Sequence, residues 1–154
     1  MKLYLVQHGE ACSKELDPDR PLTAQGVDDI DRMAAFIKQA NVRVERVIHS
    51  GKLRAQQTAE RLAAAMAPGV KPEISSLISP NDDPGTFVRQ IENREGDALV
   101  VGHLPFMAKL VSHLLDVEKA GFVTAYQPGS MVCLERVEGT HWQIDWMIRP
   151  ELLN

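Results

Sequence analysis

The stretch Ala98-Leu99-Val100-Val101-Gly102-His103 runs from apolar residues into a histidine, and Leu3-Tyr4-Leu5-Val6-Gln7-His8 near the start of the chain has the same pattern. A short apolar run of this kind is typical of a strand that is buried on both faces of a parallel sheet. In an open α/β sheet, ligands bind at the carboxyl ends of the strands. The two stretches therefore predict an α/β fold with both histidines at the ligand-binding edge of the sheet.

The segments around these two strands alternate between helical and extended patterns. We expect helices over residues 24–40 and 52–67 and from Pro84 and Pro105 onward, and further strands over residues 44–49, 73–77, 131–137 and 142–148. Glu138-Gly139-Thr140 joins the last two strands and is typical of an antiparallel hairpin. Because strands that alternate with helices form a parallel sheet covered on both faces, the expected architecture is a three-layer α/β sandwich, mainly parallel, with a C-terminal antiparallel hairpin.

The first two predicted helices carry apolar stripes. Thr23 is expected to cap the first helix. The stripe of that helix comprises Val27, Ile30, Met33, Ala34 and Ile37. The inward side chains of the second helix are expected to be Leu53, Ala59, Leu62, Ala63 and Met66. In the last strand, Trp142 and Trp146 share strand parity, which predicts packing for both rings.

Composition bounds the class of protein. A length of 154 residues corresponds to one domain, residues 1–154, and a hydrophobic content of 44% is ordinary for a soluble globular protein. The net charge of -4 disfavours nucleic-acid binding, which needs a basic surface. No apolar run approaches the roughly 20 residues of a membrane span, and the N-terminus lacks a signal-peptide pattern, so we expect a cytoplasmic location. Cys12 and Cys133 form no metal-binding motif, and both thiols are expected to be reduced.

His8 is the candidate nucleophile. A neutral imidazole nitrogen can attack phosphorus and form a phosphohistidine, and Gly9 would let the backbone approach the phosphate closely. His103 is the candidate second imidazole, and the Leu104 N–H would lie at the positive end of the helix that follows, which favours an anion. Taken alone, each histidine has an ordinary alternative, which is a hydrogen bond to a loop for His8 and a helix cap for His103.

Arg54 is the third indication of a phosphate site. A guanidinium can bind phosphate through two parallel hydrogen bonds. At the start of a helix its charge opposes the helix dipole, so an arginine there is better explained by an anion than by helix stability. The ordinary alternative is a solvated surface arginine.

Four short motifs occur in a specific order along the chain. They are Gln7-His8-Gly9-Glu10, Arg20-Pro21-Leu22-Thr23, Ser50-x-x-x-Arg54-Ala55-x-Gln57-Thr58 and Gly102-His103-Leu104-Pro105. Together they resemble the histidine phosphatase superfamily, and within it the small SixA-type phosphohistidine phosphatases. The resemblance covers Met1 to about Val111 by motif, and it extends to the C-terminal hairpin by the order of elements.

The resemblance implies a phosphoglycerate-mutase-like α/β fold and a role for each matching residue. His8 would become phosphorylated, His103 would stabilise the transferring group, and Arg54 would bind phosphate, while Arg20 would assist from the rim of the pocket. The implied reaction removes phosphate through a covalent phosphohistidine, with no cofactor and no metal. A metal held by the two histidines and Glu10 is disfavoured, because their spacing matches no compact ligand motif.

Gln7 departs from the family signature, which is Arg-His-Gly at this point. Gln7 keeps hydrogen-bond donors but lacks the charge, and loss of one transition-state donor costs on the order of 10²–10³ in rate. Three interpretations follow: weak activity, compensation by another cation such as Arg20 or Lys52, or a module that binds phosphorylated ligands without turnover. The retained histidines and Arg54 favour an enzyme.

The general acid stays open between Glu10, Asp82 and Asp83. An alcohol leaving group needs a proton from such an acid, whereas the labile P–N bond of a phosphohistidine needs less help. The expected substrate is therefore a phosphohistidine in a signalling or carrier protein, with small phosphate esters as the alternative. The remaining histidines, His49, His113 and His141, are expected to be bystanders.

Overall fold

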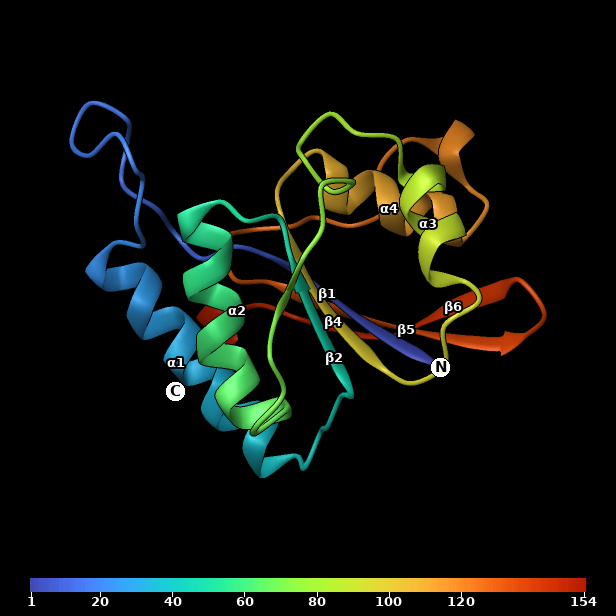
Figure 1. The fold of residues 1–154 in the computed structure, drawn as a ribbon, viewed down its shortest axis with the longest axis horizontal. Coiled ribbons are helices and arrows are strands. Elements are labelled where there is room, and N and C mark those ends of the chain that lie inside the picture. The colour runs from blue at the N-terminus through green and yellow to red at the C-terminus, as the bar shows by residue number, and fades with distance from the viewer.

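A six-stranded sheet organises the computed structural model, which describes all 154 residues. The strand order is β3-β2-β4-β1-β5-β6, and Figure 1 labels all of these strands except β3. The strands are β1 (Lys2–Gln7), β2 (Arg46–His49), β3 (Glu73–Ile74), β4 (Ala98–Gly102), β5 (Met131–Glu138) and β6 (His141–Ile148). The first four are parallel to one another, whereas β5 is antiparallel to both β1 and β6. The predicted mainly parallel sheet with a C-terminal hairpin is confirmed.

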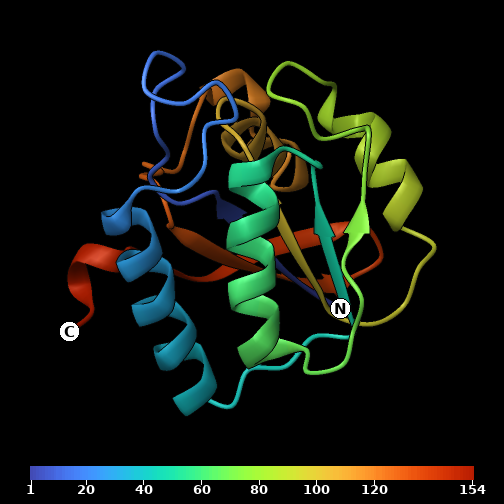
Figure 2. The same cartoon turned by 60° about the vertical axis from the view of Figure 1, so that its left-hand side comes forward.

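Helices cover both faces of this sheet. α1 (Ala24–Gln39) and α2 (Leu53–Met66) lie on one face, and α3 (Pro84–Ile91) and α4 (Phe106–Leu114) lie on the other (Figures 1 and 2). Strand β1 shows the consequence for the core, because Tyr4 and Val6 pack toward the first pair of helices and Leu3 and Leu5 toward the second. None of the helices is both long and apolar enough to cross a membrane.

Local signals set the beginnings of two helices. Thr23 caps α1 as predicted, since its Oγ1 accepts a hydrogen bond from the Gly26 N–H at 3.0 Å. Asp83 caps α3 in the same way, accepting from the Thr86 N–H at 3.0 Å. The strand expected over residues 73–77 is shorter than predicted. Only Glu73 and Ile74 pair with β2, because Ile74 is the partner of His49 and β2 ends at His49.

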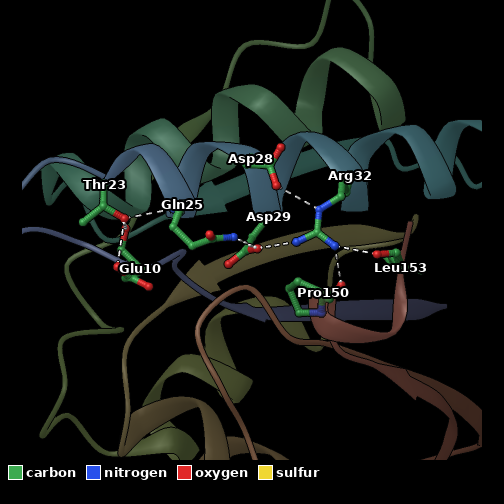
Figure 3. Close-up of polar contacts among 9 residues, drawn as sticks. Glu10, Thr23, Gln25, Asp28, Asp29, Arg32, Pro150 and Leu153 are labelled. Carbon is green, nitrogen blue, oxygen red and sulfur yellow. Dashed lines mark hydrogen bonds and ion pairs between the residues drawn. The ribbon is translucent and has the colours of Figure 1, made fainter.

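The end of the chain is tied to α1 by Arg32 (Figure 3). Its guanidinium donates to the carbonyl oxygens of Pro150 and Leu153, and it pairs with Asp29 of its own helix. Leu153 packs against the core that α1 and α2 share with the sheet. These contacts bring the short turn η2 (Pro150–Leu152) onto the flank of α1.

One inward residue of α2 was predicted wrongly. Leu53 is exposed, whereas the buried face of the helix includes Ala55, Ala59 and Leu62. Leu53 lies two positions before Ala55, which places it about 200° around the helix axis from that residue. Leu53 is therefore on the opposite side of the helix from the core.

The two tryptophans pack as predicted, but on opposite faces of the sheet. Trp142 belongs to the core under α3 and α4, whereas Trp146 packs on the α1 and α2 side, 5.9 Å from the ring of Tyr4. Cys133 pairs with Trp146 while Leu134 pairs with Ile144, so β6 contains a bulge. An extra residue in a strand moves the following side chains to the other face, and the period-two pattern cannot indicate this.

Gly26 is required where α1 meets the segment that carries Glu10. A Cβ atom at Gly26 would lie 2.1 Å from the Glu10 carbonyl oxygen, which is backbone and cannot move aside alone.

We therefore expect Gly26→Ala to lower the free energy of unfolding by about 3 kcal/mol, as overpacking of a close contact does. Urea denaturation followed by circular dichroism measures this. Gln25→Ala, at an exposed neighbouring position, should change stability by no more than about 0.5 kcal/mol. Equal stability of the two variants would contradict the close contact.

Candidate active site

His8 and His103 lie side by side at the carboxyl edge of the sheet. Gln7 and Gly102 are the last residues of β1 and β4, and they are partners in the ladder between the two strands. His8 and His103 follow them directly, so the two histidines leave adjacent strands at the same level. The ring centroids are 5.0 Å apart and the ring planes are inclined by 53°. The sequence placed both histidines at one edge, and the structure brings them into direct proximity.

The His8 ring is held in one tautomer. Nδ1 lies 2.7 Å from the Gly9 carbonyl oxygen, which can only accept, so Nδ1 carries the proton and Nε2 keeps its lone pair. Burial lowers the pKa of His8 to about 4, and the nearby positive charges of Arg54 and Arg20 act in the same direction. At neutral pH this imidazole is therefore unprotonated at Nε2, which is the form that can attack phosphorus.

His103 is almost completely buried. Its Nε2 lies 2.6 Å from the Ser50 Oγ, and its Nδ1 is buried with no hydrogen-bond partner. Burial lowers the pKa of His103 to about 3, with further lowering from His8 and Arg54. The ring is therefore neutral without a ligand, and a phosphate dianion nearby would raise its pKa.

Arg54 lies in the first turn of α2 and forms no ion pair. Its Nε is buried without a hydrogen-bond partner, and burial together with Arg20 lowers its pKa. Arg20 donates from Nε to the Cys12 carbonyl oxygen at 3.0 Å, and it too has no carboxylate partner. Lys52 is exposed at the N-cap position of α2. Because an unpaired, partly buried guanidinium is costly, these cations form a site that an anion would stabilise.

The Gln7 side chain is buried, and its Oε1 has no hydrogen-bond partner. The residue before His8 is therefore polar but uncharged. Gly9 is needed for a reason that the sequence did not reveal. A Cβ atom there would lie 2.9 Å from Cγ1 of Ile30 on α1. Leu104 lies in the turn between His103 and α4, which begins at Phe106.

The three candidate acids differ in what they contact. Glu10 is exposed and accepts a hydrogen bond from the Thr23 hydroxyl at 3.1 Å (Figure 3). Asp82 accepts from the Ser79 N–H at 2.8 Å, and Asp83 caps α3. The hydrogen bonds that Asp83 accepts from Thr86 lower its pKa, which is the wrong direction for a general acid. Glu10 follows His8 by two residues. Unlike the two aspartates, its carboxylate accepts no backbone N–H hydrogen bond from a turn or helix start.

Two of the three other histidines have local partners. His49 accepts a hydrogen bond from the Gly51 N–H at 3.0 Å, and His113 is hydrogen-bonded to Glu118. His141 is exposed at the hairpin. No group of three or more His, Cys, Asp or Glu side chains is placed to hold a metal ion.

Two residues of the third motif, Ser50 to Thr58, make contacts that the sequence did not indicate. Thr58 accepts a hydrogen bond from the Gly9 N–H at 3.0 Å, and Gln57 accepts one from the Leu22 N–H at 2.8 Å. Their spacing from Arg54 is three and four residues, which puts all three on one face of α2. The spacing could have indicated that Gln57 and Thr58 lie on the same side of the helix as Arg54. It could not indicate their partners, Leu22 and Gly9, which lie far away in the sequence.

Three hollows in the surface of the protein lie away from the paired histidines. Neither His8 nor His103 lines any of the three. The largest of the three, about 420 Å³, lies between α4 and the C-terminal hairpin and is lined by residues such as Leu114, Arg136 and Trp142.

Comparisons with known proteins agree with this geometry. The family model for the histidine phosphatase superfamily (branch 1) matches residues 3–76. Over 151 residues the chain is 32% identical to phosphohistidine phosphatase SixA of Escherichia coli (strain K12), covering 94% of this chain and 93% of that protein. An uncharacterized protein of Picosynechococcus is 33% identical over 138 residues, which covers 80% of this chain and 83% of that protein.

Solved structures show the same fold. The structure of the protein histidine phosphatase SixA complexed with tungstate matches with a TM-score of 0.87 at 25% identity, covering 99% of both chains. The alpha-ribazole phosphatase from Shigella flexneri matches with a TM-score of 0.72 at 16% identity, covering 94% of both chains. The predicted phosphoglycerate-mutase-like fold is confirmed. Similarity through nearly the whole chain, a shared fold and the motifs at the carboxyl edge show that this chain belongs to the histidine phosphatase superfamily.

Proposed function

We propose that this protein is a phosphatase that transfers a phosphoryl group from a protein phosphohistidine to His8 and then to water. The observation that carries the proposal is the His8 ring, which keeps its Nε2 lone pair free because Nδ1 donates to the Gly9 carbonyl oxygen. The neighbouring His103 ring and the unpaired Arg54 guanidinium support it, since both lie where a phosphoryl group on His8 would need stabilisation. The relatives named for phosphohistidine support the choice of substrate.

The reaction has two transfers. In the first, Nε2 of His8 bonds to phosphorus while the P–N bond to the substrate imidazole breaks, and the substrate ring, protonated at its other nitrogen, leaves as neutral histidine. The positive charge that develops on His8 is stabilised at Nδ1 by the Gly9 carbonyl. In the second, water attacks phosphorus, the P–Nε2 bond breaks and inorganic phosphate leaves, which restores neutral His8.

The surrounding residues have separate roles in this proposal. Arg54 and Arg20 bind the phosphoryl oxygens, and His103 stabilises the charge of the transferring group. Gln7 and the Leu104 N–H complete the phosphate site with neutral groups, whereas the Gly9 N–H and carbonyl oxygen are already bonded to Thr58 and His8. No step needs a metal ion.

The leaving group favours a phosphohistidine over a phosphate ester. Asp82 and Asp83 are engaged in the turn before α3 and the cap of α3, and Glu10 is exposed to solvent. An alcohol leaving group would need a buried acid with a raised pKa, whereas a protonated imidazole leaves without one. Glu10 is the carboxylate that we assign to proton transfer with the attacking water.

His8→Ala should abolish hydrolysis, because no other side chain can take its place as the nucleophile. We expect a loss on the order of 10³-fold or more. Intact mass measured without acid, after mixing with phosphoramidate, should show a phosphate adduct on the parent protein and none on the variant. His141→Ala removes an exposed histidine of the hairpin and should behave like the parent. Full activity of His8→Ala would overturn the mechanism, and phosphate binding by the parent without adduct or turnover would indicate a binding module.

His8 should remain unprotonated well below its ordinary titration range. Burial lowers its pKa from 6.5 to about 4, so the nucleophilic form is present above that value and is lost as the pH falls through it. An NMR titration of the His8 ring should therefore show almost no change between about pH 7.5 and 5. The His8→Ala spectrum assigns the signal. A titration midpoint near 6.5 would show that the ring is solvated rather than buried.

Gln7→Arg should strengthen the phosphate site, because it adds a cation at a buried position next to His8. We expect turnover or phosphate affinity to rise by on the order of 10- to 10²-fold, the scale of one transition-state donor. Calorimetric titration with inorganic phosphate and steady-state kinetics measure both quantities. Gln25→Arg adds the same charge on an exposed turn of α1 and should leave both unchanged. If Gln7→Arg also changes neither, another cation already performs this role.

A further inference from the structure

The Thr58 hydroxyl group forms two hydrogen bonds. The side chain is completely buried in α2. Its Oγ1 accepts a hydrogen bond from the Gly9 N–H at 3.0 Å and donates one to the Arg54 carbonyl oxygen at 2.8 Å. A single oxygen atom thus connects the residue after the candidate nucleophile with the residue that would bind phosphate.

Gly9 connects Thr58 to His8 through its backbone. The Gly9 N–H is held by Thr58, and the Gly9 carbonyl oxygen accepts the Nδ1 proton of His8 at 2.7 Å. If the Gly9 backbone turned, Nδ1 would lose its acceptor and the ring could carry its proton on Nε2 instead. A proton on Nε2 removes the lone pair that attacks phosphorus. The tautomer of His8 therefore depends on how Gly9 is anchored.

An ordinary structural role explains only half of these contacts. A helical threonine often donates to the carbonyl oxygen four residues earlier, and that bond needs no partner outside the helix. The bond from the Gly9 N–H is different, because it joins residues 49 positions apart and ends beside His8. The same face of α2 also contacts the segment between β1 and α1 at a second point. There, Gln57 accepts a hydrogen bond from the Leu22 N–H, two residues after Arg20.

We propose that Thr58 is a positioning residue, whose hydroxyl sets the tautomer of His8 and its distance from Arg54 through the Gly9 backbone. The inference rests on the proposed function, in which His8 is the nucleophile. It adds a residue that touches no substrate and acts on the phosphorylation step through Gly9.

Thr58→Val tests this, because valine has nearly the same shape and cannot accept the Gly9 hydrogen bond. Thr58→Ser is the matched control that keeps the hydroxyl. In single-turnover experiments with phosphoramidate, we expect Thr58→Val to slow phosphoenzyme formation by about 10- to 100-fold, the effect of a misplaced reacting group. Thr58→Ser should stay within about threefold of the parent, and the KM of Thr58→Val should change far less than its kcat. Thermal unfolding of each variant separates this effect from lost stability, and Thr58→Ala replaces the valine variant if that variant does not fold.

A second readout does not depend on catalysis. The ¹⁵N shifts of the His8 ring should report a proton on Nδ1 in the parent and in Thr58→Ser, and a mixture of tautomers in Thr58→Val. An unchanged tautomer together with an unchanged phosphorylation rate in Thr58→Val would overturn the positioning role while leaving the proposed function intact. If the parent forms no phosphoenzyme, the proposed function fails, and the tautomer comparison alone decides the role of Thr58.

Discussion

Parallel pairing of β1 with β4 is the constraint on which the site depends. Gln7 and Gly102 are partners in the ladder, so His8 and His103 emerge from adjacent strands at the same level, with their rings 5.0 Å apart. β2 lies on the other side of β4 and leads through Ser50 into α2, which brings Arg54 to the same edge. A shift of one residue in this register would turn one of the two histidines to the opposite face of the sheet.

Charge at this edge differs from that of the protein as a whole. The chain carries a net charge of -4, yet Arg54, Arg20 and Lys52 approach the two histidines with no carboxylate paired to them. Burial and the charges of Arg54 and Arg20 act together to lower the pKa of both imidazoles, and Lys52 lowers that of His103 further. The same environment thus attracts a phosphoryl group and keeps His8 in the neutral form that accepts it. Gln7 leaves one position of this environment uncharged, and the remaining cations carry the phosphate interaction.

Most of the fold could be predicted because its elements are determined by nearby residues. The apolar run that starts at Ala98 and leads into His103 forms β4 as predicted, and Thr23 caps α1 through a contact three residues away. Errors arose where a distant neighbour decides the outcome. β3 ends early because its partner strand β2 ends at His49, and the bulge in β6 separates the faces of Trp142 and Trp146.

The sequence by itself determined the family, the strand ends that carry His8 and His103, and the helix start that carries Arg54, because motif order and hydrophobic periodicity are properties of short segments. Only the tertiary structure decided which neutral groups hold these residues in place. The Gly9 N–H reaches Thr58 and the His103 ring reaches Ser50 across 49 and 53 residues of chain. Such hydrogen bonds need the strand register and the helix packing to exist first, so no local pattern indicates them. The tautomer and the lowered pKa of His8 follow from the same packing, because both depend on what surrounds the ring rather than on what precedes it in the chain.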